Sequence, residues 1–213
     1  MVSLLNALLV VVLLLNLFVL GSSRIRALIH AAALQGVVLA AMPLLAHGHV
    51  SPLTSLLAIA TTLIKGSLIP QMLFKALRDA QIKREVEPII GFIPSTLLGA
   101  LGTAASIGLA AKLPLAPGHA QTLIVPAALA TVFTGFMLLI SRIKAITQAI
   151  GYLILENGIF IFGLMLLEAV PFLVELGVLL DLFVGVFVTS IIIHHINREF
   201  ASLDTRRLSA LKE

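Results

Sequence analysis

Seven apolar blocks of about 20 residues each, separated by short polar joints, are the feature that most restricts how this chain can fold. At a rise of about 1.5 Å per residue, a helix of about 20 residues crosses the roughly 30 Å of hydrocarbon in a bilayer. Only 11% of the 213 residues are charged, against about a quarter in soluble domains. The sequence therefore predicts an all-α, polytopic membrane protein of about seven transmembrane helices. Their predicted ranges are 2–20, 27–46, 53–73, 89–111, 121–140, 146–167 and 172–193.

The first block could be mistaken for a signal peptide. It lacks a positively charged segment before the apolar run, the run is too long, and Arg24 and Arg26 follow it. We therefore expect a retained first helix.

Basic residues predict the orientation of the chain. Twelve of the 14 Lys and Arg residues fall in the joints after helices one, three and five or in the C-terminal tail: Arg24, Arg26, Lys75, Arg78, Lys83, Arg84, Arg142, Lys144, Arg198, Arg206, Arg207 and Lys212. The other joints contain only Lys112, and Lys65 lies inside helix three. Because Lys and Arg accumulate on the cytoplasmic side, we expect a multi-pass protein of a bacterial or archaeal cell (inner) membrane, with the N-terminus outside and the C-terminus in the cytoplasm.

Two parts of the chain echo each other. Helix two reads RALIHAAALQGVVLAA around Gln35, and helix six reads TQAIGYLILENGIFIFG around Glu156. The helix that follows each carries one charge near its middle, Lys65 and Asp181. This pattern predicts two parallel three-helix units joined by one helix. The expected divisions are 1–78 for the first unit, 79–118 for a cytoplasmic linker and the connecting helix, 119–196 for the second unit and 197–213 for a cytoplasmic tail.

Four polar residues lie well inside the predicted helices. An ionisable group at the bilayer centre costs on the order of 2.5 to 3.5 kcal/mol on insertion scales, so each needs a physical reason. Counted along their helices, Gln35, Lys65, Glu156 and Asp181 fall roughly 12 to 18 Å from the inner face. They can form one lateral row near the bilayer centre.

These residues allow two interpretations. Burial disfavours the charged form of any ionisable group, so Lys65, Glu156 and Asp181 can exchange protons at this depth, or Lys65 can form a static ion pair with a carboxylate. Asn157 offers Glu156 a hydrogen bond but no compensating charge. Gln35 cannot titrate, and it either bonds a water chain or braces a neighbouring helix.

Proton uptake or release could involve two further residues. His30 lies in the first turn of helix two, and a histidine can pass protons at physiological pH; a satisfied interfacial histidine is the alternative. Glu175 lies a turn inside the outer face, where it can line an outer exit or simply reach water. The histidines have no metal-binding spacing and there is no cysteine, so we expect no metal and no cofactor bound by this chain.

Pro70 and the charged segment 79–88 each predict a local structural feature. Pro70 removes the hydrogen bond to the Gly66 carbonyl and should bend helix three just cytoplasmic of Lys65; the freed carbonyl can serve function, or the bend can be a packing kink. The segment 79–88, with the sequence DAQIKREVEP, reads as a solvated cytoplasmic extension of that helix. No catalytic motif is present, and the basic residues need no nucleic acid to explain them. We expect no enzymatic activity from the chain by itself.

The three-helix unit resembles a known family. Through RIRALIHAAALQ and SLLAIATTLIKGSLIPQMLFKAL, the chain resembles the K subunit of respiratory complex I and the C subunit of Mrp-type cation/proton antiporters, which carry glutamate where this chain has Gln35 and Lys65. The second unit keeps an acid at Glu156 and offers Asp181. With four further helices, nearly the whole chain resembles hydrogenase-4 component E, a membrane subunit of formate hydrogenlyase-type complexes.

The resemblance implies a membrane subunit of a complex-I-like, redox-driven complex that translocates protons or sodium ions. Its partners would be antiporter-like and quinone-subunit-like membrane subunits, the lipid bilayer and, indirectly, a soluble redox module. Lys65, Glu156 and Asp181 would form the proton relay, with Gln35 as an orienting partner. The alternatives are a subunit of an Mrp-type antiporter, a purely structural subunit, or an independent transporter with a substrate site between the repeats.

Overall fold

The computed structural model describes residues 2–46, 52–79, 86, 88–114 and 122–166, with residues 177, 180, 183–185, 187, 190–191 and 194. Its elements are α1 (Val2–Gly21), α2 (Ile25–Ala46), α3 (Pro52–Leu63), a π-helical turn η1 (Ile64–Leu68), α4 (Ile69–Asp79), α5 (Phe92–Ala110), α6 (Ile124–Ser141), α7 (Ala145–Gly163) and a 3-10 turn η2 (Leu164–Leu166). In this part of the chain every regular element is a helix, so the predicted all-α class is confirmed.

Six helical segments of the described residues are long and apolar enough to cross a membrane, α3, η1 and α4 together forming one of them. The predicted multi-pass membrane protein is therefore confirmed. The seventh predicted helix lies largely outside the described residues, although those described between 177 and 194 are helical. The division into two parallel units stays a prediction.

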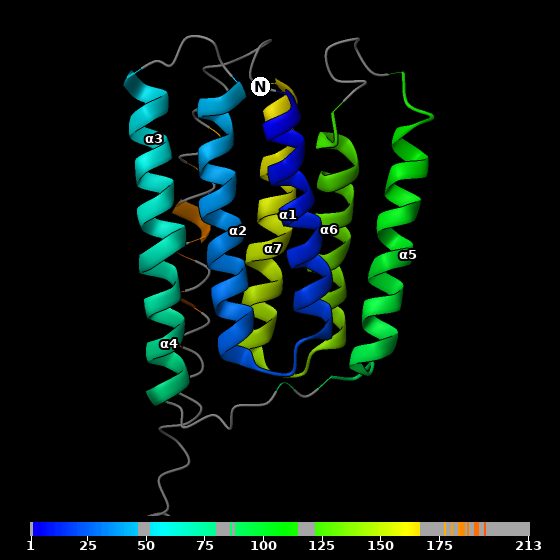
Figure 1. The fold of residues 1–213 in the computed structure, drawn as a ribbon. Coiled ribbons are helices and arrows are strands. Elements are labelled where there is room, and N and C mark those ends of the chain that lie inside the picture. Colours follow the sequence, from blue (N-terminus) through cyan, green and yellow to red (C-terminus); the bar gives the residue numbers. More distant parts are fainter. Residues whose placement is uncertain are drawn as a thin grey trace, which may run out of the picture.

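The helices stand side by side in a single bundle (Figure 1). Helices α1, α2, α6 and α7 occupy its centre, the column of α3, η1 and α4 forms one flank, and α5 forms the other. α1 packs against α2, α5 and α6, and α2 packs against α3 and α7. Residues from both halves of the sequence thus meet in the middle of the bundle.

Helices α6 and α7 touch along their backbones because glycines line their contact. A Cβ atom added at Gly158 would lie 2.6 Å from the backbone nitrogen of Val132, and one at Gly135 would lie 2.5 Å from that of Leu155. Small residues let transmembrane helices approach closely where lipid supplies no hydrophobic driving force between them. This contact fixes the part of α7 that carries Glu156.

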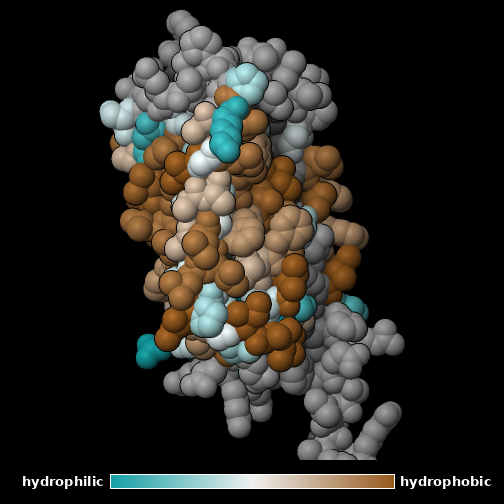
Figure 2. Space-filling model, turned by 90° about the vertical axis from the view of Figure 1, so that its right-hand side faces the viewer, coloured by the Kyte–Doolittle hydropathy of each residue, from teal (hydrophilic) through white to brown (hydrophobic). Residues whose placement is uncertain are grey.

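The outer flank is apolar. Figure 2 shows a hydrophobic surface over the side of the molecule where α5 lies, with hydrophilic residues toward both ends. Ile93, Leu97 and Leu101 of α5 are each at least 60% exposed. An exposed apolar band along a transmembrane helix is the surface that a bilayer, or another membrane subunit, covers.

The segment after α4 does not wholly continue the helix, which corrects one expectation. Val86 is buried, and its N–H donates to the Ser23 carbonyl at 3.0 Å. Pro88 forms an antiparallel bridge with Arg142. Val86 and Pro88 therefore do not continue α4, because their backbones pair with the α1–α2 and α6–α7 joints.

Arg142, which the sequence indicated only as a marker of topology, is buried in the joint between α6 and α7. Its Nη2 donates to the Leu20 carbonyl at 2.8 Å, and its guanidinium lies 5.1 Å from the centre of the Phe92 ring. Burial lowers the pKa of Arg142, but an arginine stays protonated in proteins. A cation thus ties together the ends of α1, α5 and α6.

Candidate functional site

A layer of buried polar side chains crosses the middle of the bundle. It comprises Asn16, Gln35, Lys65, Thr131, Glu156 and Asn157, none more than 7% exposed. On one side lies an apolar cluster that includes Leu9, Leu39 and Ile161. On the other lies a cluster that includes Leu28 and Ile150. The two clusters separate the polar layer from both ends of the bundle.

A close ion pair forms the charged part of this layer. The Lys65 Nζ lies 2.9 Å from the Glu156 Oε1, and it also lies 5.8 Å from the centre of the Phe160 ring. In a low-dielectric interior each charge alone would be strongly unfavourable, and the pair offsets part of that cost. The charge that compensates Glu156 therefore comes from the other half of the sequence. The sequence had predicted that Lys65 could pair with a carboxylate, but not that this carboxylate is Glu156.

Asn157 contacts the other member of the pair. The Lys65 Nζ donates to Asn157 Oδ1 at 3.1 Å, and Asn157 Nδ2 donates to Gln35 Oε1 at 3.2 Å. Gln35 Nε2 donates in turn to Asn16 Oδ1 at 2.9 Å. Three amides thus connect Lys65 to α1.

The chain of hydrogen bonds ends on α6 and has one direction throughout. Asn16 Nδ2 donates to Thr131 Oγ1 at 2.8 Å, and the Thr131 hydroxyl donates to the Ala127 carbonyl at 2.6 Å. Because every donor points away from Lys65, every amide oxygen in the chain faces toward it. Aligned hydrogen bonds polarise one another, so the chain stabilises the positive charge of Lys65.

A π turn presents Lys65 to this layer. The Ile69 N–H bonds to the Ile64 carbonyl, five residues earlier, as in a π-helix. Pro70 follows directly and has no N–H to donate to Gly66. The structure thus has a π turn that contains Lys65 directly before Pro70, and the bend itself stays a prediction. Such turns occur frequently at functional sites.

Two glycines bring α2 against the π turn. A Cβ added at Gly36 would lie 2.8 Å from the Lys65 Cβ, and one added at Gly66 would lie 2.6 Å from Val37 Cγ2. These distances are shorter than packed carbon atoms allow. Glycine at both positions is therefore what lets Lys65 reach Asn157 past α2.

A further glycine lies against the Glu156 carboxylate. A Cβ added at Gly185 would stand 3.0 Å from Glu156 Oε2 and 3.1 Å from Oε1. Gly185 is buried and helical. Gly185 thus lies next to the charged pair, and the sequence analysis had not assigned this residue to the site.

The predicted site residues have different outcomes. Gln35, Lys65 and Glu156 come together in one layer as predicted. Asp181 and Glu175 lie outside the described residues. His30 is away from the layer: it is exposed, its Nδ1 lies 2.8 Å from the Arg26 carbonyl, and its ring lies 5.0 Å from that of Phe74.

Asn16 and Thr131 are functional candidates that the sequence analysis missed. Asn16 interrupts the run LLLNLF, a signal of the same kind as the glutamine within helix two. Thr131 gives little signal, because a threonine in a transmembrane helix usually bonds its own backbone. Among the described residues no group of three His, Asp or Glu side chains is placed to hold a metal ion.

Comparison with known proteins identifies relatives of this chain. No protein-family profile and no solved structure matches it significantly. The chain is 32% identical over 193 residues to the uncharacterized protein Rv0085 of Mycobacterium tuberculosis, covering 89% of this chain and 87% of that protein. It belongs to the same family as that protein. It is also 34% identical over 101 residues to hydrogenase-4 component E of Escherichia coli, covering 47% of this chain and 46% of that protein.

The same 34% identity over 101 residues is found with hydrogenase-4 component E of Shigella flexneri. The predicted relationship to hydrogenase-4 component E is therefore confirmed, over a shorter stretch than the sequence analysis suggested. In this match the chain spans about half the length of hydrogenase-4 component E.

The Lys65–Glu156 pair can be tested by a double-mutant cycle. Lys65→Met or Glu156→Gln alone should lower the free energy of unfolding by about 3–5 kcal/mol, because each leaves one buried charge uncompensated. The double variant should lose clearly less than the sum of the two. Melting in detergent micelles measures all three, with Lys112→Met, at an exposed position, as the control. Strictly additive losses would show that the two side chains do not interact.

Gly185 offers a second test. Gly185→Ala should lower the free energy of unfolding by about 1–3 kcal/mol, because the added methyl group crowds the Glu156 carboxylate. Gly177→Ala is the matched control, since a Cβ there meets nothing within 4 Å. Adding Glu156→Ala to Gly185→Ala should relieve the crowding. An equal effect of both glycine variants would contradict the contact.

Proposed function

We propose that this chain is a non-catalytic membrane subunit of a redox-driven, ion-translocating complex of the cell membrane, and that its Lys65–Glu156 pair carries protons. The observation that carries the proposal is the pair itself, buried in a polar layer between two apolar clusters. Intramembrane ionisable residues are costly and commonly mark ion or proton pathways. The relationship to hydrogenase-4 component E favours a place within a larger assembly.

The proposed chemistry is proton exchange within the pair. A proton that reaches the Glu156 carboxylate neutralises it and removes the negative charge that lies 2.9 Å from the Lys65 ammonium. The ammonium then releases a proton, since burial disfavours an unpaired charge. Amine and carboxyl are now both neutral; release of the carboxyl proton to the amine restores the pair. One proton enters and one leaves in each cycle.

The chain of three amides indicates the side from which protons do not reach the Lys65–Glu156 pair. Amide groups keep their protons at physiological pH, so Asn157, Gln35 and Asn16 orient Lys65 and do not conduct. We therefore propose that protons reach the pair from the side of Gly185, which packs against the Glu156 carboxylate. Asp181, four residues before Gly185 in the sequence, is the proposed next member of the relay.

The proposed partners are other membrane subunits and, indirectly, a soluble redox module. The apolar flank of α5 suits a neighbouring membrane subunit, of the antiporter-like or quinone-subunit-like kind. Redox chemistry would take place on a soluble module, and the energy would reach this chain through those membrane subunits. Protons or sodium ions are the proposed coupling ions.

A purely structural role is the rival function, and the same observation supports it, because a 2.9 Å ion pair can also be static. Lys65→Arg separates the two roles. Arginine preserves the positive charge and the ion pair, but it does not release its proton in proteins. In the intact complex, we expect assembly on blue-native gels to be retained and redox-driven ion translocation in vesicles to fall to background.

Lys112→Arg is the matched control, because it makes the same exchange at an exposed position outside the bundle core. It should assemble and translocate as the unmodified protein does. Full translocation by an assembled Lys65→Arg complex would show that the pair is structural.

A further inference from the structure

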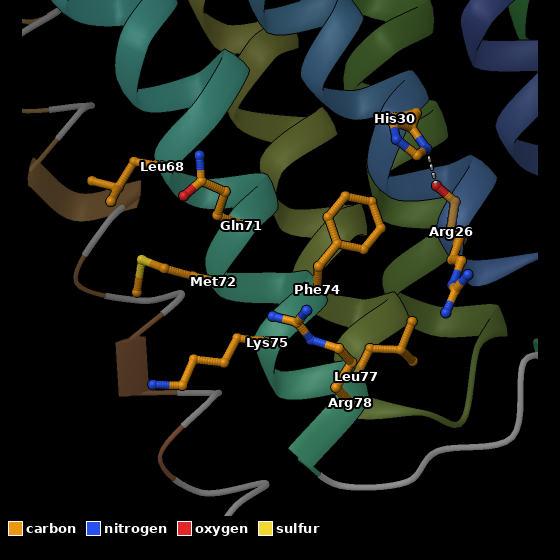
Figure 3. Close-up of a pocket in the computed structure, with 9 residues that line it drawn as sticks. All are labelled: Arg26, His30, Leu68, Gln71, Met72, Phe74, Lys75, Leu77 and Arg78. Carbon is orange, nitrogen blue, oxygen red and sulfur yellow. Dashed lines mark hydrogen bonds between the residues drawn. The ribbon is translucent and has the colours of Figure 1, made fainter.

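A groove lies on the bundle surface away from the polar layer, between α2 and α4. It has a volume of about 640 Å³, within the roughly 300–1,000 Å³ of sites that take whole small molecules. Its lining combines positive charge with apolar surface: Arg26, His30, Leu68, Gln71, Met72, Phe74, Lys75, Leu77 and Arg78. Figure 3 shows Arg26 and His30 entering it from α2, while the other labelled side chains come from the η1–α4 column.

Positive charge in the lining of the groove increases toward one end. Leu68 belongs to the π turn next to the polar layer, and Arg78 is the penultimate residue of α4. Their separation of ten positions along the chain corresponds to about 15 Å of helix, the depth of roughly half a bilayer. Met72 lies on the way, and Lys75 follows near the basic end. Leu68 and Met72 thus lie toward the deep end of the groove, together with Gln71, and the cations of α4 lie toward the membrane surface.

The cations of the groove have no acidic partner in the described part of the chain. Arg26, Lys75 and Arg78 are exposed, and the ion pair found among the described residues is the one between Lys65 and Glu156. Three positive side chains around one groove repel one another unless an anion lies between them. The groove therefore complements a molecule with a negative head and an apolar body.

From this charge pattern and depth we propose that the groove binds an anionic phospholipid of the leaflet facing the basic joints. The headgroup phosphate lies at the basic end of the groove, against Arg26 and Arg78, and an acyl chain extends along α4 toward Leu68. Basic pockets between transmembrane helices are suited to phosphate headgroups, and guanidinium groups match phosphate oxygens in a two-point geometry. This binding site does not depend on proton transfer at Lys65.

Native mass spectrometry of the purified full chain in a neutral detergent tests the proposal. The probes are dioleoyl phosphatidylglycerol, dioleoyl phosphatidylcholine with the same acyl chains, and inorganic phosphate. We expect phosphatidylglycerol to bind at least about tenfold more tightly than phosphatidylcholine, because each nearby Arg contributes appreciably to binding an anionic surface. Inorganic phosphate should neither bind measurably nor displace the lipid.

The variant Arg26→Gln with Arg78→Gln should lose that preference, while the matched variant Arg24→Gln with Lys112→Gln removes two exposed charges outside the groove and should keep it. Equal melting temperatures in detergent alone verify that both fold. Equal affinity for the two lipids, an unchanged preference in the first variant, or displacement by inorganic phosphate would each overturn the proposal.

Discussion

The central constraint on this structure is the burial of two opposite charges between two apolar clusters of the bundle. Lys65 and Glu156 lie between two apolar clusters, so water that would screen them is excluded on both sides. Their attraction is correspondingly strong, and so is the cost of separating them. The neighbouring features act either to bring the two charges together or to satisfy the polar groups beside them.

Helix geometry follows from this constraint. The π turn aims Lys65 inward, and Gly36 lets α2 pass close enough for the amine to reach Asn157. The amides of Asn157, Gln35 and Asn16 then extend the network across three helices. A partly satisfied network would be worse than an apolar core; here each amide both donates and accepts.

The sequence predicted the membrane-spanning helices well, because hydrocarbon thickness fixes their length and leaves few alternatives. It also placed Gln35, Lys65 and Glu156 at one depth, since depth follows from counting residues along a helix. It did not show that Lys65 would pair with Glu156. That pairing depends on which helices become neighbours, and patterns of small residues do not determine the order of helices around a bundle.

Neutral polar residues inside helices and charged residues at helix ends were harder to interpret from the sequence. Asn16 was overlooked because an amide costs less to bury than a charge, so it attracts less attention in an apolar run. Arg142 was interpreted from its place in a basic joint, whereas its burial depends on the Phe92 ring and the Leu20 carbonyl, which come from distant segments. In both cases the decisive partner lies more than 20 residues away or on a helix whose position the sequence does not give.

Infrared difference spectroscopy of the intact complex, poised first oxidised and then reduced, tests the proposed proton exchange most directly. A protonated carboxyl group has a carbonyl band that a carboxylate lacks. The account predicts such a band that changes between the two states in the unmodified complex and is missing in the Glu156→Gln variant. A Glu156 that remains ionised in both states would contradict it.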